Sequence, residues 1–205
     1  MLMGRWMNWP LLESMERQPM RNPRDSFCSY CGREFARPLR YPRKCQNPSC
    51  GADVYANPIP VALVLLPVTV GEQTGLLVVR RAIEPQLGKL ALVGGFVEEF
   101  ESWQQGAARE VREEAGLVID PSKLVPYHFA STEPRPNRVL LFTLGPTLRA
   151  SDLPSFVPNH EVSERGVIFG TQGLEPHFAF SLHLQMATRF FDERRIGGPH
   201  RFQPL

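Results

Sequence analysis

Residues 94–117 read GGFVEEFESWQQGAAREVREEAGL, a segment with six glutamates and two arginines. Ser102 stands three residues before Gln105, which is the spacing of a capping box at a helix N-terminus. Small and aliphatic residues follow at spacings near 3.6, and Gly116 stands where helices commonly end. The sequence therefore predicts a helix over residues 102–115.

Three of the glutamates, Glu110, Glu113 and Glu114, stand at positions i, i+3 and i+4 and project from one face of this helix. Like charges at these spacings repel one another, whereas a divalent cation turns the repulsion into attraction, and Mg²⁺ favours carboxylate oxygens. Arg109 could pair with Glu113 one turn on, or with Glu101 before the helix, and so orient the carboxylates. The alternative is a solvated acidic face without a ligand.

The string as a whole matches the pattern G-x5-E-x7-R-E-U-x-E-E-x-G-U, in which U is aliphatic, from Gly95 to Leu117. This pattern is the Nudix box, and the chain resembles the Nudix hydrolases from about residue 58 to residue 193. The resemblance implies an α/β fold, an α/β/α sandwich around a mixed sheet. It also implies an enzyme that cleaves nucleoside diphosphates linked to a second moiety, by attack of water on one phosphorus.

The resemblance assigns roles to the box residues. Glu110 and Glu114 would be the main ligands of Mg²⁺ or Mn²⁺, and Glu113 would be a further ligand or the group that activates water. Glu101 and Arg109 would brace the helix. Gly95 would offer its carbonyl or permit a tight loop.

Residues outside the helix are candidates for contacts with the substrate. Arg81, in RRAIEPQLGK (80–89), could contact a phosphate, and Glu98 could reach the metal or the substrate. Arg135, in STEPRPNRVLLF (131–142), stands where NADH pyrophosphatases carry an aromatic residue, and it could stack on a base or pair with a phosphate. The alternative for this segment is a proline-rich loop before a strand at 138–144.

A later segment, NHEVSERGVIF (159–169), resembles the glutamate-rich loop and strand of the family. Glu161 or Glu164 could approach the metals and act as the general base. A solvated loop glutamate is the alternative for each.

All four cysteines of the chain, Cys28, Cys31, Cys45 and Cys50, follow the spacing C-x2-C-x13-C-x4-C. Two close pairs on tight turns are typical of a closed, structural Zn²⁺ site. Disulfides would need an oxidising compartment, and a redox pair would be expected beside a βαβ pattern. A zinc ribbon before a Nudix domain is similar to the NADH pyrophosphatase group and to ADP-ribose and FAD pyrophosphatases.

The composition shifts after YANPIP (55–60) to long apolar runs, which predicts a domain boundary. We expect a weakly ordered tail over 1–24, a zinc ribbon over 25–56, a Nudix domain over 57–195 and a tail over 196–205. The runs on either side of TVGEQT predict a hairpin, and GKLALVGGFVE predicts a strand that ends in a Gly-Gly turn.

The chain has no apolar run long enough to span a membrane, and its net charge of +2 does not indicate nucleic-acid binding. A cytoplasmic protein is therefore expected, and the resemblance implies a small-molecule nucleotide substrate and a homodimer. Two other functions remain open. The first is a sensor that binds ADP-ribose compounds without hydrolysis, and the second is an enzyme that removes nucleotide caps from RNA.

Overall fold

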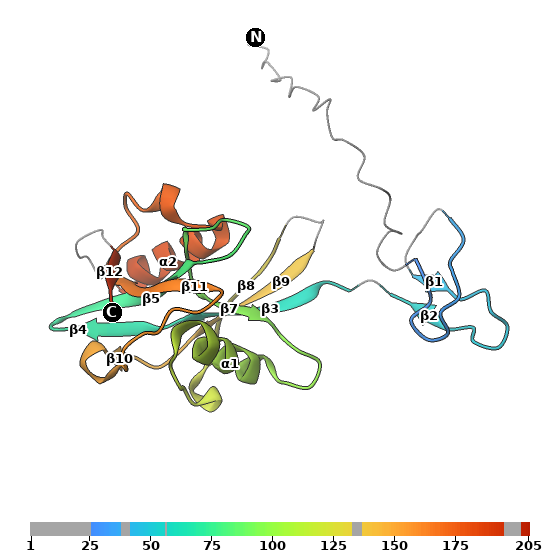
Figure 1. Ribbon diagram of the computed structural model, residues 1–205, viewed down its shortest axis with the longest axis horizontal. Coiled ribbons are helices and arrows are strands. Elements are labelled where there is room, and N and C mark those ends of the chain that lie inside the picture. Colours follow the sequence, from blue (N-terminus) through green and yellow to red (C-terminus); the bar gives the residue numbers. More distant parts are fainter. Residues whose placement is uncertain (1–25, 38–41, 56, 133–136, 195–201) are drawn as a thin grey trace, which may run out of the picture. The chain divides into compact units, whose positions relative to one another are not determined.

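The computed structural model describes residues 26–37, 42–55, 57–132, 137–194 and 202–205. The chain divides into two compact units, with the boundary between Asn57 and Pro58 (Figure 1). No helix in the described ranges is long and apolar enough to cross a membrane. The two units are described in turn.

Residues 26–37, 42–55 and 57, the described part of the first unit, contain little regular structure. Strand β1 (Arg43–Lys44) pairs antiparallel with β2 (Asp53–Val54), and an isolated bridge joins Phe27 to Glu34. Its buried apolar residues form one small cluster of Cys28, Phe35, Cys45 and Val54. A core of this size buries too little surface to stabilise a fold without help.

The second unit contains two sheets that together form one layer. The first sheet has the order β7-β3-β9-β8, and the second has the order β10-β4-β5-β11-β12, with β6 paired to β5. Strands β3 and β9 pair in parallel, and β3 pairs antiparallel with β7, so the sheet is mixed. The strands are β3 (Ile59–Leu65), β4 (Pro67–Val70), β5 (Gln73–Arg81), β6 (Leu90–Ala91), β7 (Val93–Phe96), β8 (Val125–Ser131), β9 (Arg138–Leu144), β10 (Leu148–Arg149), β11 (Val162–Ile168) and β12 (Phe202–Pro204).

Two helices cover opposite faces of this layer, as Figure 1 shows. They are α1 (Trp103–Ala115) and α2 (Ser181–Arg194), and the 3-10 turns are η1 (Pro121–Lys123), η2 (Ala150–Asp152) and η3 (Glu175–His177). Alternate residues of β3 explain the two faces: Ala62 and Val64 pack with α1, whereas Leu63 and Leu65 pack with α2. The predicted α/β/α sandwich around a mixed sheet is therefore confirmed.

The helix and the hairpin form as the sequence predicts. The hydroxyl of Ser102 accepts from the N–H of Gln105, and the Gln105 side chain accepts from the N–H of Ser102, so the capping box is complete. Gly116 ends α1 in the left-handed conformation, with φ 67°. Strands β4 and β5 are joined by a two-residue turn that begins at Gly71, where φ is 60°.

Two segments differ from the sequence prediction. The Gly-Gly pair does not form a turn but lies inside β7, opposite Leu63 and Ala62 of β3. Of the segment predicted as a C-terminal tail, Phe202–Pro204 form β12 and pair with β11. A Cβ on Gly166 of β11 would lie 2.2 Å from the Phe202 ring, so this glycine makes room for the added strand.

One buried histidine makes the stability of this unit sensitive to acid. His183 of α2 lies against Phe142 and Phe180, and its Nδ1 accepts a hydrogen bond of 3.2 Å from the N–H of Leu92. Burial lowers the pKa of His183 from 6.5 to about 3. Between these values the unfolded chain binds the proton and the folded chain does not, so stability is lost as the pH falls below about 6.5.

We expect the unfolding free energy to fall by about 2 kcal/mol, on account of His183, when the pH is lowered from 7 to 5. Urea unfolding at both pH values, on the parent protein and on His183→Asn, measures this contribution. The asparagine oxygen can still accept from the Leu92 N–H but does not titrate. The variant should therefore lose less stability on acidification than the parent, and equal losses in the two proteins would contradict the assignment.

Candidate active site

Arg109, in the middle of α1, is the centre of a hydrogen-bonded cluster that joins the helix to the loop before it. Its Nε and Nη2 donate to the two carboxylate oxygens of Glu101, at 3.2 and 2.8 Å. Nη1 donates to Glu110 at 2.9 Å and to Glu113 at 3.0 Å, and Nη2 also donates to the carbonyl oxygen of Phe96 at 2.9 Å. Both pairings predicted for Arg109 are present, and all five of its N–H donors are used.

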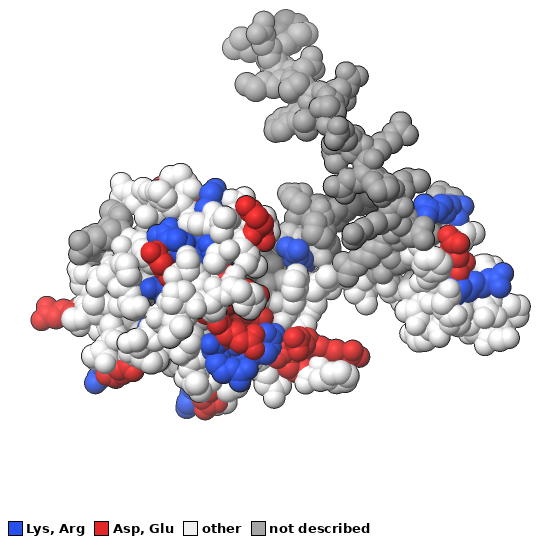
Figure 2. Space-filling view, viewed as in Figure 1, with Lys and Arg blue, Asp and Glu red and all other residues white. Residues whose placement is uncertain are grey.

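The cluster holds the loop before α1 against the helix. Glu101 also accepts from the backbone N–H of Glu98, at 2.9 Å. The hydrogen bonds from Arg109 lower the pKa of the Glu101 carboxyl, which keeps it charged. Figure 2 shows the acidic side chains of this region beside a basic patch over α1 and the preceding loop. Glu98 contributes its backbone to this arrangement, and its side chain is exposed.

Two carboxylates of α1 are buried. Glu110 is 8% exposed and Glu114 is 9% exposed. Burial raises the pKa of both carboxyls, that of Glu114 to about 8, because the charged form loses its hydration. Arg109 is paired with Glu110, whereas no salt bridge to Glu114 forms among the described residues. A divalent cation shared by the two carboxylates would compensate the remaining charge, so this pair has the character expected of metal ligands.

The glycines of β7 bring backbone up to these two carboxylates. The N–H of Gly94 donates to Glu114 at 2.9 Å. A Cβ on Gly95 would lie 2.4 Å from a carboxylate oxygen of Glu110, and a Cβ on Gly94 would lie 2.1 Å from the carbonyl oxygen of Ala62. A side chain at Gly94 would therefore force β7 away from β3, and a side chain at Gly95 would displace the Glu110 carboxylate.

Glu113, the third glutamate of the predicted set, shares Arg109 Nη1 with Glu110 but is far more exposed than the buried pair. Its side chain is 49% exposed and is paired with Arg109 and Arg112. The three glutamates do not bring their carboxylate oxygens together as one close group. Among the described residues, only the four cysteines form a group of three or more potential metal ligands with mutually close ligand atoms. Two carboxylates suit Mg²⁺, which is usually bound through one or two carboxylates together with substrate phosphates.

The other candidates divide into those near the buried pair and those away from it. The charges of Arg81 and Glu161 both act on Glu114, whereas Glu164 is paired with Arg80. The Arg81 guanidinium lies 5.4 Å from the centre of the Phe180 ring, and its Nε donates to the carbonyl oxygen of Pro85 at 3.0 Å. Arg135 lies outside the described residues.

The sequence motifs did not indicate two features of this site. Gly94 was expected to act as a turn residue, but its N–H is a partner of Glu114. Asn159 donates from its side-chain amide to the carbonyl oxygen of Glu113 at 2.8 Å, and no pattern in the sequence pointed to it. A capping or loop asparagine is too common for its long-range partner to be inferred.

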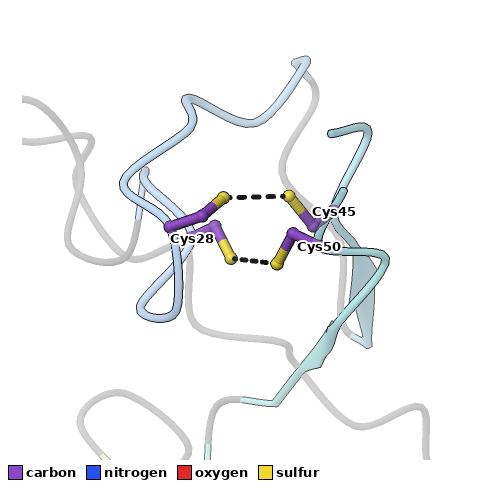
Figure 3. A group of neighbouring side chains, drawn as sticks. Cys28, Cys45 and Cys50 are labelled. Atoms are coloured by element: carbon purple, nitrogen blue, oxygen red, sulfur yellow. Dashed lines mark hydrogen bonds between the residues drawn. The ribbon is translucent and has the colours of Figure 1, made fainter. Parts of the chain in front are cut away.

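The four cysteines form a second candidate metal site in the first unit. Two segments turn their thiols toward one another (Figure 3), and all four Sγ atoms lie within 4.8 Å of one another. The Sγ–Sγ distances of 3.9 Å for Cys28–Cys50 and 3.5 Å for Cys31–Cys45 are too long for disulfides. They bracket the edge of about 3.8 Å that a tetrahedron with Zn–S bonds of about 2.3 Å would have.

The turns around these cysteines have the local geometry that the sequence predicts. Gly32 and Gly51, which follow the second cysteine of each pair, have φ of 74° and 60°. A hydrogen bond from the Arg33 backbone lowers the pKa of the Cys31 thiol to about 7, whereas burial and neighbouring thiols raise the pKa of Cys45 to about 12 and also raise that of Cys50. Zinc would therefore have to displace protons from the thiols that it binds. The donor set and the spacing therefore fit a structural zinc ion.

Comparison with known proteins agrees with this geometry. The NAD-capped RNA hydrolase NudC of Deinococcus radiodurans is 33% identical over 116 residues, which are 56% of this chain and 39% of that protein. The enzyme of the same name from Stutzerimonas stutzeri is 36% identical over 100 residues, 48% of this chain and 34% of that protein. The chain thus spans less than half the length of these curated relatives.

A solved structure and a family model also match the chain. The crystal structure of a NUDIX hydrolase from Nitrosomonas europaea is 28% identical, with a TM-score of 0.61 over 85% of this chain and 95% of that one. The model of the NUDIX domain matches residues 59–168, more than half of the sequence. On this match and on the carboxylate helix it contains, the chain belongs to the Nudix family.

Proposed function

We propose that this chain is a Mg²⁺- or Mn²⁺-dependent pyrophosphohydrolase. Its substrate would be a dinucleotide or ADP-linked compound of the NAD(H), FAD or ADP-ribose class. The products would be a nucleoside monophosphate and a phosphorylated remainder. The observation that carries the proposal is the buried pair of carboxylates, Glu110 and Glu114, on the helix of a Nudix domain.

The residues of the site would divide the work as follows. Glu110 and Glu114 would hold the divalent ion, which supplies neutralisation of phosphate charge and a lower pKa for the attacking water. Arg109, whose donors are all used by the protein, would fix the position of Glu110. Arg81 would bind a phosphate oxygen, and Glu161 would take the proton from the water, since the charges of both reach Glu114.

The proposal extends to the rest of the chain. Residues 25–56 would be a ribbon folded by Zn²⁺ on the four cysteines, and residues 57–195 would be the hydrolase domain. A homodimer in the cytoplasm, acting on small nucleotides without a membrane partner, is part of the same proposal. Glu98 and Arg135 would contribute substrate contacts from the loops that flank the site.

A second candidate function has a specific observation in its favour. Both curated relatives are hydrolases of NAD-capped RNA, and the bond cleaved in such a cap is also a pyrophosphate. An RNA substrate would add contacts between its phosphate backbone and basic side chains of the protein. Its binding would therefore weaken steeply as the salt concentration rises. A nucleotide sensor is disfavoured because both buried glutamates of the box are present.

The test is a comparison of kcat/KM across substrates in the presence of Mg²⁺ or Mn²⁺. The panel contains NADH, NAD, FAD, ADP-ribose, dinucleoside polyphosphates and nucleoside triphosphates, together with an RNA that carries a 5′ NAD cap. Products are identified by chromatography, and ¹⁸O-labelled water shows which phosphorus is attacked. We expect a nucleoside monophosphate from at least one of the dinucleotide or ADP-linked compounds.

Each class of function gives a different result. A preference for capped RNA over free NAD that declines with salt would favour the second candidate. Tight binding of ADP-ribose without turnover would identify a sensor and overturn hydrolysis. Activity on nucleoside triphosphates alone would overturn the proposed substrate class while leaving the metal site intact.

A further inference from the structure

The C-terminal end of α1 carries Glu113 and Glu114. Its backbone carbonyls accept hydrogen bonds from the backbone that directly follows the helix and from side chains of distant segments. The N–H groups of Gly116 and Leu117 donate to the carbonyls of Arg112 and Val111, which is the usual local closure of a helix. The carbonyls of Glu113 and Ala115 accept hydrogen bonds from side chains that are distant in the sequence. The carbonyl of Glu113 accepts from Asn159.

Arg165 supplies the other long-range partner. This residue of β11 is 2% exposed, and its Nη1 donates to the carbonyl of Ala115 at 2.7 Å. Its Nη2 donates to the carbonyl of Pro154, also at 2.7 Å. A buried guanidinium at a helix C-terminus also complements the negative end of the helix dipole. The last turn of α1 is therefore fastened to β11 and to the segment before it.

Asn159 uses both ends of its side-chain amide. Its Nδ2 donates to the Glu113 carbonyl at 2.8 Å, while its Oδ1 accepts from the backbone N–H groups of Glu161 and Val162, each at 2.9 Å. Its own N–H donates to the carbonyl of Val162 at 2.9 Å. One residue thus closes the turn that carries Glu161 and joins this turn to the metal-binding helix.

The Glu161 turn has one further anchor, a hydrogen bond of 2.7 Å from the N–H of Ala82 to the Glu161 carbonyl. Ala82 follows Arg81 at the end of β5. The turn is therefore held between the helix on one side and the end of β5 on the other. The Glu161 side chain is 41% exposed, and its Oε1 lies 3.1 Å from Nε2 of His160. The turn that carries it is tied through Asn159 to α1, on which the buried pair lies, and its charge raises the pKa of both Glu110 and Glu114.

We infer that Asn159 is a positioning residue, which sets the place of the Glu161 carboxylate relative to Glu110 and Glu114. The inference rests on the proposed function, because it assumes that these carboxylates form a divalent-metal site. Only a planar amide of this length both donates to the helix carbonyl and accepts from the turn. Aspartate keeps the acceptor but loses the donor, and alanine loses both.

The test is a double-mutant cycle on Asn159→Ala and Glu161→Gln, measured first as Mn²⁺ affinity from the electron paramagnetic resonance of free Mn²⁺. Partners that orient metal-site residues typically cost about 10- to 100-fold in affinity or activity when removed. We expect each single variant to weaken Mn²⁺ binding by about tenfold. If Asn159 acts through Glu161, the double variant should bind no more weakly than Glu161→Gln alone.

Two further variants separate positioning from general damage to the fold. Asn159→Asp keeps the turn but loses the helix contact, so its Mn²⁺ affinity should fall between those of the parent and Asn159→Ala. Asp120→Ala is the matched control, because Asp120 Oδ1 accepts from the N–H of Ser122 at 2.9 Å in a similar turn at η1. It should lower the unfolding temperature without changing Mn²⁺ affinity.

When the same variants are compared by steady-state kinetics, the substitutions should lower kcat rather than raise KM. Independent, multiplicative losses from the two substitutions would overturn the inference, as would an unchanged Mn²⁺ affinity in Glu161→Gln. The proposed function can be contradicted independently of this inference. If no substrate of the panel is hydrolysed while the Mn²⁺ cycle remains non-additive, Asn159 keeps its positioning role and the hydrolase assignment is lost.

Discussion

Glu114→Gln is expected to reduce kcat by more than about 100-fold. Removal of a residue that only orients a metal ligand typically costs about 10- to 100-fold in activity, and removal of a ligand itself should cost more. Glu114 is one of two buried carboxylates available to the divalent ion, and an amide oxygen carries no charge to hold it. The fold should persist, because glutamine can still accept from the Gly94 N–H and avoids burying a charge. Steady-state kinetics with the best substrate of the panel measures the loss, and thermal unfolding checks the fold.

Two control variants make this result specific. Glu193→Gln removes a carboxylate that pairs with Arg189 and Tyr127 on the other side of the sandwich, so its kcat should equal that of the parent. Glu113→Gln removes the half-exposed glutamate of α1, and we expect a loss of at most about tenfold, at the low end for an orienting residue. Retained activity in purified Glu114→Gln would contradict the assignment of the site.

Removal of zinc is expected to unfold the first unit and leave the second folded. Among its described residues, the first unit buries only two apolar residues besides cysteines in its cluster, Phe35 and Val54. In small modules of this kind, metal binding supplies on the order of 10 kcal/mol of folding free energy. Hydrogen exchange before and after chelation should show loss of protection around Cys28 and Cys45, with β3 and α1 unchanged.

Cys45→Ser should reproduce the effect of the chelator, because it removes one of the four thiolates. Tyr30→Ser is the matched control, since Tyr30 lies between the first two cysteines and is 73% exposed. Elemental analysis of the parent protein should find one zinc per chain. Unchanged exchange after chelation, or a protein isolated without metal, would contradict a zinc-dependent fold.

The elements that could be predicted from the sequence are those whose determinants are local. The capping box at Ser102 and Gln105 and the terminal Gly116 predict α1, and the spacing of the glutamates predicts its charged face. The cysteine spacing and the glycines after each pair likewise predict the two turns that carry the cysteines. Each of these features depends on residues within a few positions of one another.

The features that could not be predicted depend on contacts between distant segments. Gly94 and Gly95 look like turn residues in the sequence, yet they serve the close approach of β7 to β3 and to Glu110. Glu113 and Glu114 are adjacent and chemically identical, and only the packing of α1 exposes one and buries the other. The difference between their environments arises from the sheet against which the helix lies.

The use of all five donors of Arg109 has a consequence for how substrate choice could change. A side chain with every N–H already committed to the protein has none to offer an incoming nucleotide, so it does not discriminate among nucleotides through hydrogen bonds. Recognition and scaffolding are thus carried by different residues. The loops on either side of the helix can diversify in evolution, or be redesigned, while the arginine and its acceptors stay constant and preserve the reaction.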